Sequence, residues 1–458
     1  MPVLVRSLVA VAVASMLAAA AARAADVPHL APHGTATQFI VDGKPYLVLG
    51  GELSNSSASD PEYLSSLWAG LGEVGLNTVF APVEWGQLEP HQGRFDFSVV
   101  DALVKQAHQH HMHLVVLWFG AWKNSMSTYV PPWMKRNYSR YSRARDDRGQ
   151  AQDILSPFNP ETLQADSAAL SALMSHLKQW DLDRTVIAVQ VENEIGMLPV
   201  VRDYGERAQA AYEGAVPPVL LNYLQTHRDS LNPYVRDLWA MRGFKGAGTW
   251  AEVFGTTIPA QEVFQAWYPS AGPLPHLFDI WKAGGPDIDM IAMDMYFPNF
   301  IEWASKFKRS DNPFFSPEDN QAGRPDAGAN AFYAIGELNS MSFSPCAIDT
   351  LTADNRVSLV SAYDVLRQLS PQTNHGGLAI QTGNDEFIVA GQGITLTFED
   401  ADQRRMAVGI QQDIAGSYVG AEWTPGRWLN GDDTLGGRQV HLPSDRFSIQ
   451  RVTLFKYD

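Results

Sequence analysis

Short apolar runs alternate with longer amphipathic stretches between about residues 36 and 370. Such runs are typical of strands buried on both faces of a parallel sheet, and the stretches between them are typical of the covering helices. The expected strands are Tyr46–Gly51, Asn77–Val83, His113–Phe119, Thr185–Val191, Ile288–Tyr296, Asn312–Pro317 and Ala331–Ile335. The clearest expected helices are Pro61–Leu71, with Ser59 or Asp60 as N-cap, Phe97–His108 and Pro160–Trp180.

This alternation predicts an α/β fold, a (β/α)8 TIM barrel over residues 30–370. An open doubly wound sheet is the second interpretation, and it is less favoured because the chain has no Gly-rich dinucleotide fingerprint. The pattern supplies seven convincing strands, not eight. No strand is visible between residues 192 and 287, so strand five is expected to be shortened or missing unless this gap hides it.

After about residue 371 the helical periodicity gives way to short strand candidates separated by Gly, Asn and Asp. These candidates are Leu378–Gln381, Glu386–Ala390, Ile394–Phe398, Ala407–Gln411 and Ile449–Phe455. They predict a small all-β, sandwich-like domain over residues 375–458, with the boundary in Ser370–Gly377. Trp423 and Trp428 are expected to pack against the barrel rather than to form a carbohydrate platform.

The start of the chain has the features of a secretory signal peptide over residues 1–24. Arg6 supplies the positive charge, residues 7–22 are apolar and Ala-rich, and Ala22-Arg23-Ala24 matches a cleavage site. No later apolar run reaches the roughly 18 residues that a membrane span requires. We therefore expect an exported protein, periplasmic or extracellular, without a membrane span.

The amino-acid composition excludes several classes of binding partner and bound group. The formal net charge of −16 argues against nucleic acid or an anionic membrane as a partner. The single cysteine, Cys346, excludes an internal disulfide and a cysteine-based zinc site. Four histidines cluster before the third strand, on the face of a barrel that lies away from the chemistry, so no functional metal site is expected there. They are His108, His110, His111 and His113.

Candidate chemistry lies where the strands end. Asn193 and Glu194 follow the fourth strand, in the run QVENEIG, and strand ends point into the mouth of a barrel. Hydrolysis of a glycosidic bond needs a second carboxyl group. Two candidates each follow a predicted strand: Glu318 ends NPFFSPE, and Glu337 ends AFYAIGE.

Several motifs resemble those of the clan A retaining glycoside hydrolases, and in particular the bacterial β-galactosidases of glycoside hydrolase family 35 that carry a C-terminal β-domain. The resemblance extends over nearly the whole chain after residue 24. The motifs are Gly50-Gly51-Glu52, Ala81-Pro82-Val83-Glu84-Trp85, Leu88-Glu89-Pro90, Gly93-Arg94-Phe95-Asp96-Phe97, Leu117-Trp118-Phe119, Val191-Glu192-Asn193-Glu194, Asp294-Met295-Tyr296 and Asn312–Glu318.

The resemblance implies roles for individual residues. Glu194 would be the acid/base on strand four, and Glu318 rather than Glu337 would be the nucleophile on strand seven. Asn193 would bond the sugar 2-hydroxyl, and Tyr296 would keep the nucleophile ionised. The sugar pocket would be lined by Glu52, Glu84, Trp118, Trp122 and Glu337. No cofactor is implied.

The predicted function is that of an exported retaining β-galactosidase acting on plant-type oligosaccharides. To serve as an acid near neutral pH, Glu194 needs a raised pKa, and a negative Glu318 nearby would raise it. A β-glucosidase or β-mannan-active hydrolase of the same clan is an alternative. A non-catalytic carbohydrate-binding protein on a degraded barrel is another, because strand five and the start of the β-domain look trimmed.

Overall fold

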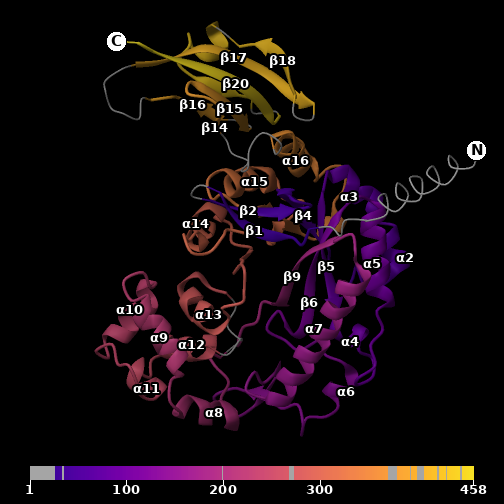
Figure 1. Ribbon diagram of the computed structural model, residues 1–458, viewed down its shortest axis with the longest axis vertical. Helices are drawn as coiled ribbons and strands as arrows, with labels where there is room; N and C mark the ends of the chain where they lie inside the picture. The colour runs from indigo at the N-terminus through magenta and orange to yellow at the C-terminus, as the bar shows by residue number, and fades with distance from the viewer. Residues whose placement is uncertain are drawn as a thin grey trace, which may run out of the picture.

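The structure is a computed structural model. It describes residues 26–33, 36–198, 200–267, 273–369, 379–391, 394–399, 407–419, 422–429, 431–443 and 446–457. The predicted signal peptide and the predicted boundary at Ser370–Gly377 lie outside the described residues. A curved parallel sheet forms the centre of the molecule, and a C-terminal part made mostly of strands lies at one end (Figure 1).

Five parallel strands form the first part of the curved sheet, in the order β12-β4-β5-β6-β9. Four of them fall on predicted strands, because their apolar side chains are buried on both faces. The five are β4 (Val48–Glu52), β5 (Thr78–Glu84), β6 (His113–Lys123), β9 (Val186–Asn193) and β12 (Ser342–Phe343).

Three further parallel strands, β10 (Asp294–Met295), β11 (Glu318–Gln321) and β13 (Pro345–Cys346), form the second part. Residues 342–346 pair with β4 through β12 and with β11 through β13. This short segment therefore joins the two parts into one barrel-like sheet. The predicted strand at 288–296 was too long, because pairing there is limited to β10. The predicted strand at 312–317 was placed too early, because pairing begins only at Glu318.

The prediction of a strand at Ala331–Ile335 was wrong. These residues lie in the buried helix α15 (Ala327–Gly336). A short apolar run in a helix that is buried on most sides has no polar face, so its pattern resembles that of a buried strand.

The fifth strand is absent from the described part of residues 194–293, and β9 and β10 are not paired. Helices with a hydrophobic core of their own occupy this stretch. They are α8 (Glu206–Glu213), α9 (Pro218–Thr226), α10 (Pro233–Ala240), α11 (Trp250–Val253), α12 (Ile258–Trp267) and α13 (Phe278–Gly284). The stretch without a predicted strand is therefore a real gap in the barrel. In Figure 1 these helices lie together below α14 and α15.

Side chains on β6 alternate between two cores. Val115, Leu117 and Phe119 face the interior of the curve, where they join Phe39 and Phe315. Leu114, Val116 and Trp118 face the covering helices. The small antiparallel sheet of β1 (His29–His33), β2 (Ala36–Val41) and β3 (Lys44–Pro45) supplies the interior core with apolar side chains.

Two of the covering helices begin at side-chain caps. The predicted helix Pro160–Trp180 is α7, and Asn159 caps it by accepting a hydrogen bond from the N–H of Glu161 (3.0 Å). The predicted helix at 61–71 is two helices, with Asp60 as the N-cap of the first. The others on the sheet are α2 (Pro61–Ser65), α3 (Trp68–Val74), α4 (Trp85–Leu88), α5 (Ser98–Gln109), α6 (Pro132–Lys135), α14 (Phe300–Ala304) and α16 (Val357–Leu369).

The C-terminal strands form an antiparallel sheet in the order β14-β15-β20-β17-β18, with a two-stranded sheet of β16 and β19 beside it. One face of the large sheet joins the barrel core through Tyr418 and Ile449, and the side chain of Gln368 on α16 accepts from the N–H of Tyr418 (3.1 Å). The strands are β14 (Ala379–Gln381), β15 (Glu386–Gly391), β16 (Ile394–Leu396), β17 (Ala407–Val419), β18 (Glu422–Trp428), β19 (Val440–Leu442) and β20 (Ser448–Tyr457).

Of the two C-terminal tryptophans, Trp423 packs against the barrel core as expected, whereas Trp428 is exposed. No helix among the described residues combines the length and the apolar character that crossing a membrane requires.

A buried asparagine holds the irregular chain before β10. The Asn312 side chain accepts from the N–H of Ile291 (3.0 Å) and donates to its carbonyl oxygen (2.8 Å). We expect Asn312→Ala to lower the free energy of unfolding by about 2–4 kcal/mol, because two buried backbone groups lose their partner. Urea unfolding measures this loss, and the exposed Asn299→Ala should stay within about 0.5 kcal/mol of the parent. An equal effect of both substitutions would contradict the role of Asn312.

Candidate active site

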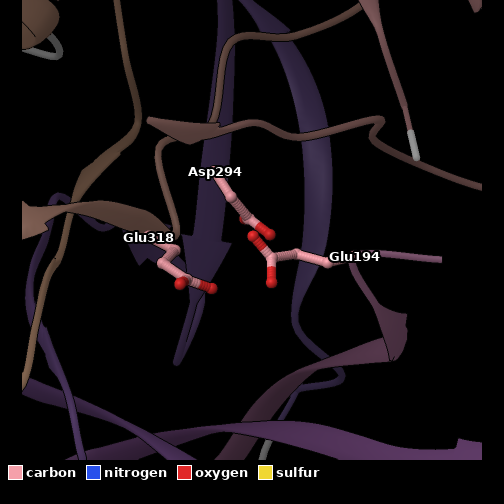
Figure 2. A group of neighbouring side chains, drawn as sticks. All are labelled: Glu194, Asp294 and Glu318. Carbon is pink, nitrogen blue, oxygen red and sulfur yellow. The ribbon is translucent and has the colours of Figure 1, made fainter. Parts of the chain in front are cut away.

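Three carboxyl groups converge at the end of β9 and at the first residues of β10 and β11 (Figure 2). They belong to Glu194, directly after β9, Asp294 on β10 and Glu318 on β11. One carboxylate oxygen from each lies within 4.8 Å of the others. The three groups thus face one another although β9 and β10 are not paired.

The backbone at the end of β9 is strained. Glu192 and Glu194 have φ angles of 63° and 45°, in the left-handed region that side chains other than glycine seldom adopt. The carbonyl oxygen of Glu194 accepts from the N–H of Ser125 (2.9 Å). Strain of this kind persists where surrounding contacts impose it, and it is concentrated at functional sites.

Two side chains donate to the carboxylate of Glu318. The amide Nδ2 of Asn193 donates to Oε2 (3.2 Å), and the hydroxyl of Tyr296 donates to Oε1. Burial and the charge of Glu318 raise the pKa of Tyr296 far above its usual range, so Tyr296 remains a hydrogen-bond donor. Each oxygen of the Glu318 carboxylate therefore accepts a hydrogen bond from a side chain.

Asn193 connects the two unpaired edges of the sheet. Its Nδ2 also lies 3.3 Å from Oδ2 of Asp294, across the gap that strand five would fill. Its Oδ1 accepts from the ammonium of Lys123. The position of its amide is therefore set from three sides.

Lys123 is a site residue that the sequence analysis did not find. It is 5% exposed and lies at the end of β6. Its positive charge opposes the rise in pKa that burial gives to Glu52, Glu194 and Asp294. The signal in the sequence was a lysine that directly follows the apolar run of β6.

The carboxyl groups of the cluster favour different protonation states. Burial, followed by the charge of Glu318, raises the pKa of Glu194. Burial and the same charge raise the pKa values of Glu52 and Asp294 well above their usual range. Glu52 also shares a hydrogen bond with Glu318. Burial and neighbouring negative charge therefore favour the protonated forms of Glu52 and Asp294.

A second buried pair lies behind the end of β9. The carboxyl group of Glu192 accepts from the N–H groups of Ala121 and Trp122, both at 2.9 Å. Burial, the charge of Asp166 and a hydrogen bond to Asp166 raise the pKa of Glu192 well above its usual range. Glu192 thereby joins the end of β9 to the segment of β6 that carries Lys123.

Both tryptophans expected in the sugar pocket lie elsewhere, which corrects that prediction. Trp118 is fully buried against the helices, where its Nε1 donates to Asp166 (2.9 Å). Trp122 is buried and its Nε1 donates to the carbonyl oxygen of Leu155 (3.1 Å), on β8 (Ala151–Leu155), which pairs with β7 (Arg143–Arg145). Their strand positions are even, and even positions on β6 face outward from the curve.

The three glutamates predicted to line the sugar pocket lie in different places. Glu52 joins the acid cluster. Glu84 is half-buried at the end of β5, beside Tyr129, and burial raises its pKa. Glu337 is exposed at the C-terminal end of α15, not at a strand end, so its expected place in the pocket and as alternative nucleophile is corrected.

Cys346, at the end of β13, was noted in the sequence only for its rarity. Its thiol shares a hydrogen bond with Tyr296. Burial and the neighbouring carboxylates raise the pKa of this thiol to about 11, so it stays protonated.

The histidines before β6 face different partners. His108 approaches Asp183 (3.8 Å), His113 approaches Asp42 (3.8 Å), and His110 stacks on Trp68. They do not converge. Glu194, Asp294 and Glu318 are close enough to hold a metal ion, but both oxygens of Glu318 already accept bonds from protein donors.

Comparison with known proteins identifies the class. Residues 38–262 match the family model "Glycosyl hydrolases family 35". This match confirms the resemblance to glycoside hydrolase family 35 that the motifs carry. Residues 347–441 match a second model, "Domain of unknown function (DUF5597)".

A curated relative, a β-galactosidase of Xanthomonas manihotis, is 32% identical over 195 residues. The match covers 40% of this chain and 29% of the relative. Solved structures include a β-galactosidase from Marinomonas ef1, 12% identical with a TM-score of 0.46, covering 70% of this chain and 60% of that one. An exo-β-1,4-mannosidase from Opitutaceae bacterium strain TAV5 is 16% identical with a TM-score of 0.41, covering 66% and 52%.

Lys123 should control the pH range of activity. Its ammonium lowers the pKa of Glu194, so in Lys123→Met that pKa should rise. An acid is lost as the pH rises through its pKa, and the alkaline limb of kcat/KM should therefore move up by about 1 pH unit. We also expect kcat/KM to fall about tenfold or more, because Asn193 loses a partner.

The measurement is a pH–rate profile on an aryl β-galactoside. Lys105→Met on the exposed side of α5 removes the same charge away from the cluster, and its profile should match the parent. A limb that stays in place, or moves to lower pH, in Lys123→Met would contradict the assignment.

Proposed function

We propose that this protein is a retaining β-glycosidase, most specifically a β-galactosidase acting on plant-type oligosaccharides by double displacement. The spacing of Glu194 and Glu318 is the observation that carries the proposal. Retaining enzymes hold their two carboxyl groups about 5–5.5 Å apart, and inverting enzymes hold them about 6.5–9.5 Å apart. One carboxylate oxygen of Glu194 lies within 4.8 Å of one of Glu318, a close approach that supports the first class.

In the first step, the carboxylate of Glu318 attacks the anomeric carbon while the protonated Glu194 gives its proton to the departing oxygen. The hydrogen bonds from Tyr296 and Asn193 hold the carboxylate of Glu318 in position as the nucleophile. The negative charge of Glu318 helps to keep Glu194 protonated until that charge is consumed in the new bond.

In the second step, the ester to Glu318 carries no charge, and the pKa of Glu194 falls. Glu194, now ionised, takes a proton from water, which attacks the anomeric carbon and releases the sugar with retained configuration. In their protonated forms, Glu52 and Asp294 can donate hydrogen bonds to sugar hydroxyls. Asn193 is placed beside the nucleophile, where it can bond the 2-hydroxyl.

The galactose preference rests on the β-galactosidase relative and on the family 35 match. Turnover of aryl β-galactosides well above that of aryl β-glucosides and β-mannosides supports it. A preference for either of the other sugars would assign the site to another activity of the clan. No turnover of any aryl glycoside would instead favour a carbohydrate-binding protein on an open barrel.

The two glutamates should respond differently to substitution. Glu318→Ala should lose activity on every substrate, and azide should restore turnover with inverted product, because the small anion enters the space left by the nucleophile. Glu194→Ala should retain the first step on substrates with good leaving groups, and azide should give product of retained configuration.

General acid catalysis contributes roughly 10²–10⁴-fold, so the loss in Glu194→Ala should differ by about this factor between poor and good leaving groups. Product configuration is read by proton NMR. The exposed Glu337→Ala, which removes the same group outside the cluster, should leave turnover close to that of the parent. Equal losses for both leaving groups, with no response to azide, would contradict both roles.

We also propose that the protein is exported, with residues 1–24 removed. The charged start, the apolar run and the Ala22-Arg23-Ala24 triplet support this proposal. The mature chain should then begin at or near Ala25. N-terminal sequencing of protein recovered from the periplasm or the medium measures it, and exported protein that still began at Met1 would exclude cleavage here.

A further inference from the structure

The end of β9 is held from behind by two carboxyl groups that the double displacement does not use. Glu192 lies on β9, and Asp166 lies on the covering helix α7. Glu192 is 7% exposed, and its two oxygens accept from the backbone N–H groups of Ala121 and Trp122 on β6, both at 2.9 Å. Glu192 therefore fastens β9 to β6 two residues before Glu194.

The carboxyl groups of Glu192 and Asp166 meet beside Gly120. A methyl group on Gly120 would lie 2.6 Å from Oε1 of Glu192 and 2.7 Å from Oδ1 of Asp166, so both oxygens lie around one point. Nε1 of Trp118 lies at the same point and donates to Oδ1 of Asp166 (2.9 Å). The glycine at position 120 leaves the room in which the two carboxyl groups approach each other.

A proton joins these two carboxyl groups. Without a proton, carboxylate oxygens offer each other only lone pairs, and two buried negative charges this close repel. Burial, followed by the charge of Asp166 and a hydrogen bond to it, raises the pKa of Glu192 well above its usual range. Glu192 is therefore the donor of this hydrogen bond, and Asp166 is the acceptor.

Charged side chains on the neighbouring elements face other partners. They are Lys123 on β6 with Asn193, Glu89 after α4 with Trp85, Asp101 on α5 with His176 on α7, Glu161 on α7 with Arg140, and Asp153 on β8 with Arg143. The proton, rather than a cation among these side chains, joins Glu192 to Asp166.

The backbone that this pair holds is strained where the groups of the candidate active site begin. Glu192 and Glu194 have φ angles of 63° and 45°, and Asn193 between them directs its amide to Glu318 (3.2 Å). Such backbone persists where contacts impose it, and the bonds of Glu192 to β6 and α7 are contacts of this kind. A displacement of about 1 Å in a catalytic group can cost roughly 10²-fold in rate.

We propose that Asp166 is a positioning residue for the candidate active site: it accepts the proton of Glu192, and this bond keeps Asn193 and Glu194 in place. When the proton is lost, two adjacent carboxylates repel each other and the end of β9 is released, so activity falls reversibly as the pH rises. The effect on activity rests on the proposed function, whereas the shared proton is measurable without turnover.

The first test compares the Tm of the full-length protein and of Asp166→Asn between about pH 5 and pH 8. A carboxyl group with a raised pKa stabilises the fold most at low pH, and this contribution is lost as the pH rises from about 4.3 toward the pKa in the folded state. In Asp166→Asn the new amide donates to Glu192, which can then ionise among three N–H donors, so the loss disappears. The Tm of Asp166→Asn relative to the parent should therefore rise by about 3 °C or more across this range.

The second test measures kcat/KM on an aryl β-galactoside with a good leaving group, which needs little proton donation from Glu194. Asp166→Asn should stay within about threefold of the parent at low pH and should exceed it at high pH, because its hydrogen bond to Glu192 no longer depends on a proton. Removing a negative charge would by itself lower the pKa of Glu194, so an electrostatic effect on Glu194 would move activity in the opposite direction.

Two further variants separate positioning from packing. Asp166→Ala leaves the proton of Glu192 and the N–H of Trp118 without an acceptor, and kcat/KM should fall about tenfold or more at every pH. Glu192→Gln should lose a similar factor, because its amide NH₂ faces a backbone N–H group of β6. Glu161→Gln is the matched control, since it removes a carboxylate from the surface of the same helix, and both of its pH profiles should match those of the parent.

Two results would overturn the proposal. If the Tm difference between Asp166→Asn and the parent does not change with pH, Glu192 and Asp166 share no proton. If Asp166→Asn loses as much activity as Asp166→Ala at every pH, the side chain of Asp166 acts through packing alone. A parent that turns over no aryl glycoside would reject the proposed function, and the Tm profile would still decide whether the proton is shared.

Discussion

One ammonium beside a cluster of buried and partly buried carboxyl groups is the constraint on which the candidate active site depends. The charge of Lys123 acts on Glu52, Glu194 and Asp294, which lie near Glu318, and like charges this close cannot all ionise away from water. In the structure, the hydrogen-bond donors of the cluster are directed at one carboxylate, that of Glu318. Glu318 receives the hydroxyl of Tyr296 and the amide of Asn193, and the others hold protons more firmly.

The same constraint explains how an open sheet can carry a site. Backbone pairing is absent between β9 and β10, which are the strands that present Glu194 and Asp294. Side chains replace it, because Asn193 reaches Asp294 across the gap and Asn312 binds the backbone of Ile291. An unpaired strand edge is exposed to water or to other chains unless something covers it. Here polar side chains that also serve the site bond across the gap.

Much of this arrangement followed from the sequence. Continuous apolar runs located β4, β5, β6 and β9 because both faces of a parallel strand are buried. The polar residues at the ends of those runs were then expected to meet at one edge, as Glu52 and Asn193 do beside Glu318. The structure brings together the candidates that were chosen as polar residues at strand ends more often than those that were chosen for residue type alone.

The errors have physical causes of the same kind. Ala331–Ile335 is apolar on nearly all sides because α15 is buried, and a run of five residues does not distinguish periods of 2 and 3.6. Trp118 and Trp122 were chosen because aromatic rings stack on sugars, but the alternation of β6 turns them outward. Lys123 directly follows the same apolar run, and a lysine there is informative because such a charge is seldom buried alone.

Within the run Glu192-Asn193-Glu194, two identical side chains have different parts because their surroundings differ. The carboxyl group of Glu192 is buried behind the strand, bonded to two backbone N–H groups of β6 and to Asp166. Glu194 is only partly buried and faces Glu318, whose charge changes during a double displacement. A group fixed by backbone contacts can hold geometry but cannot exchange a proton with substrate. The two surroundings thus give the two glutamates different roles: Glu192 fixes the end of β9, and Glu194 is placed to transfer protons there.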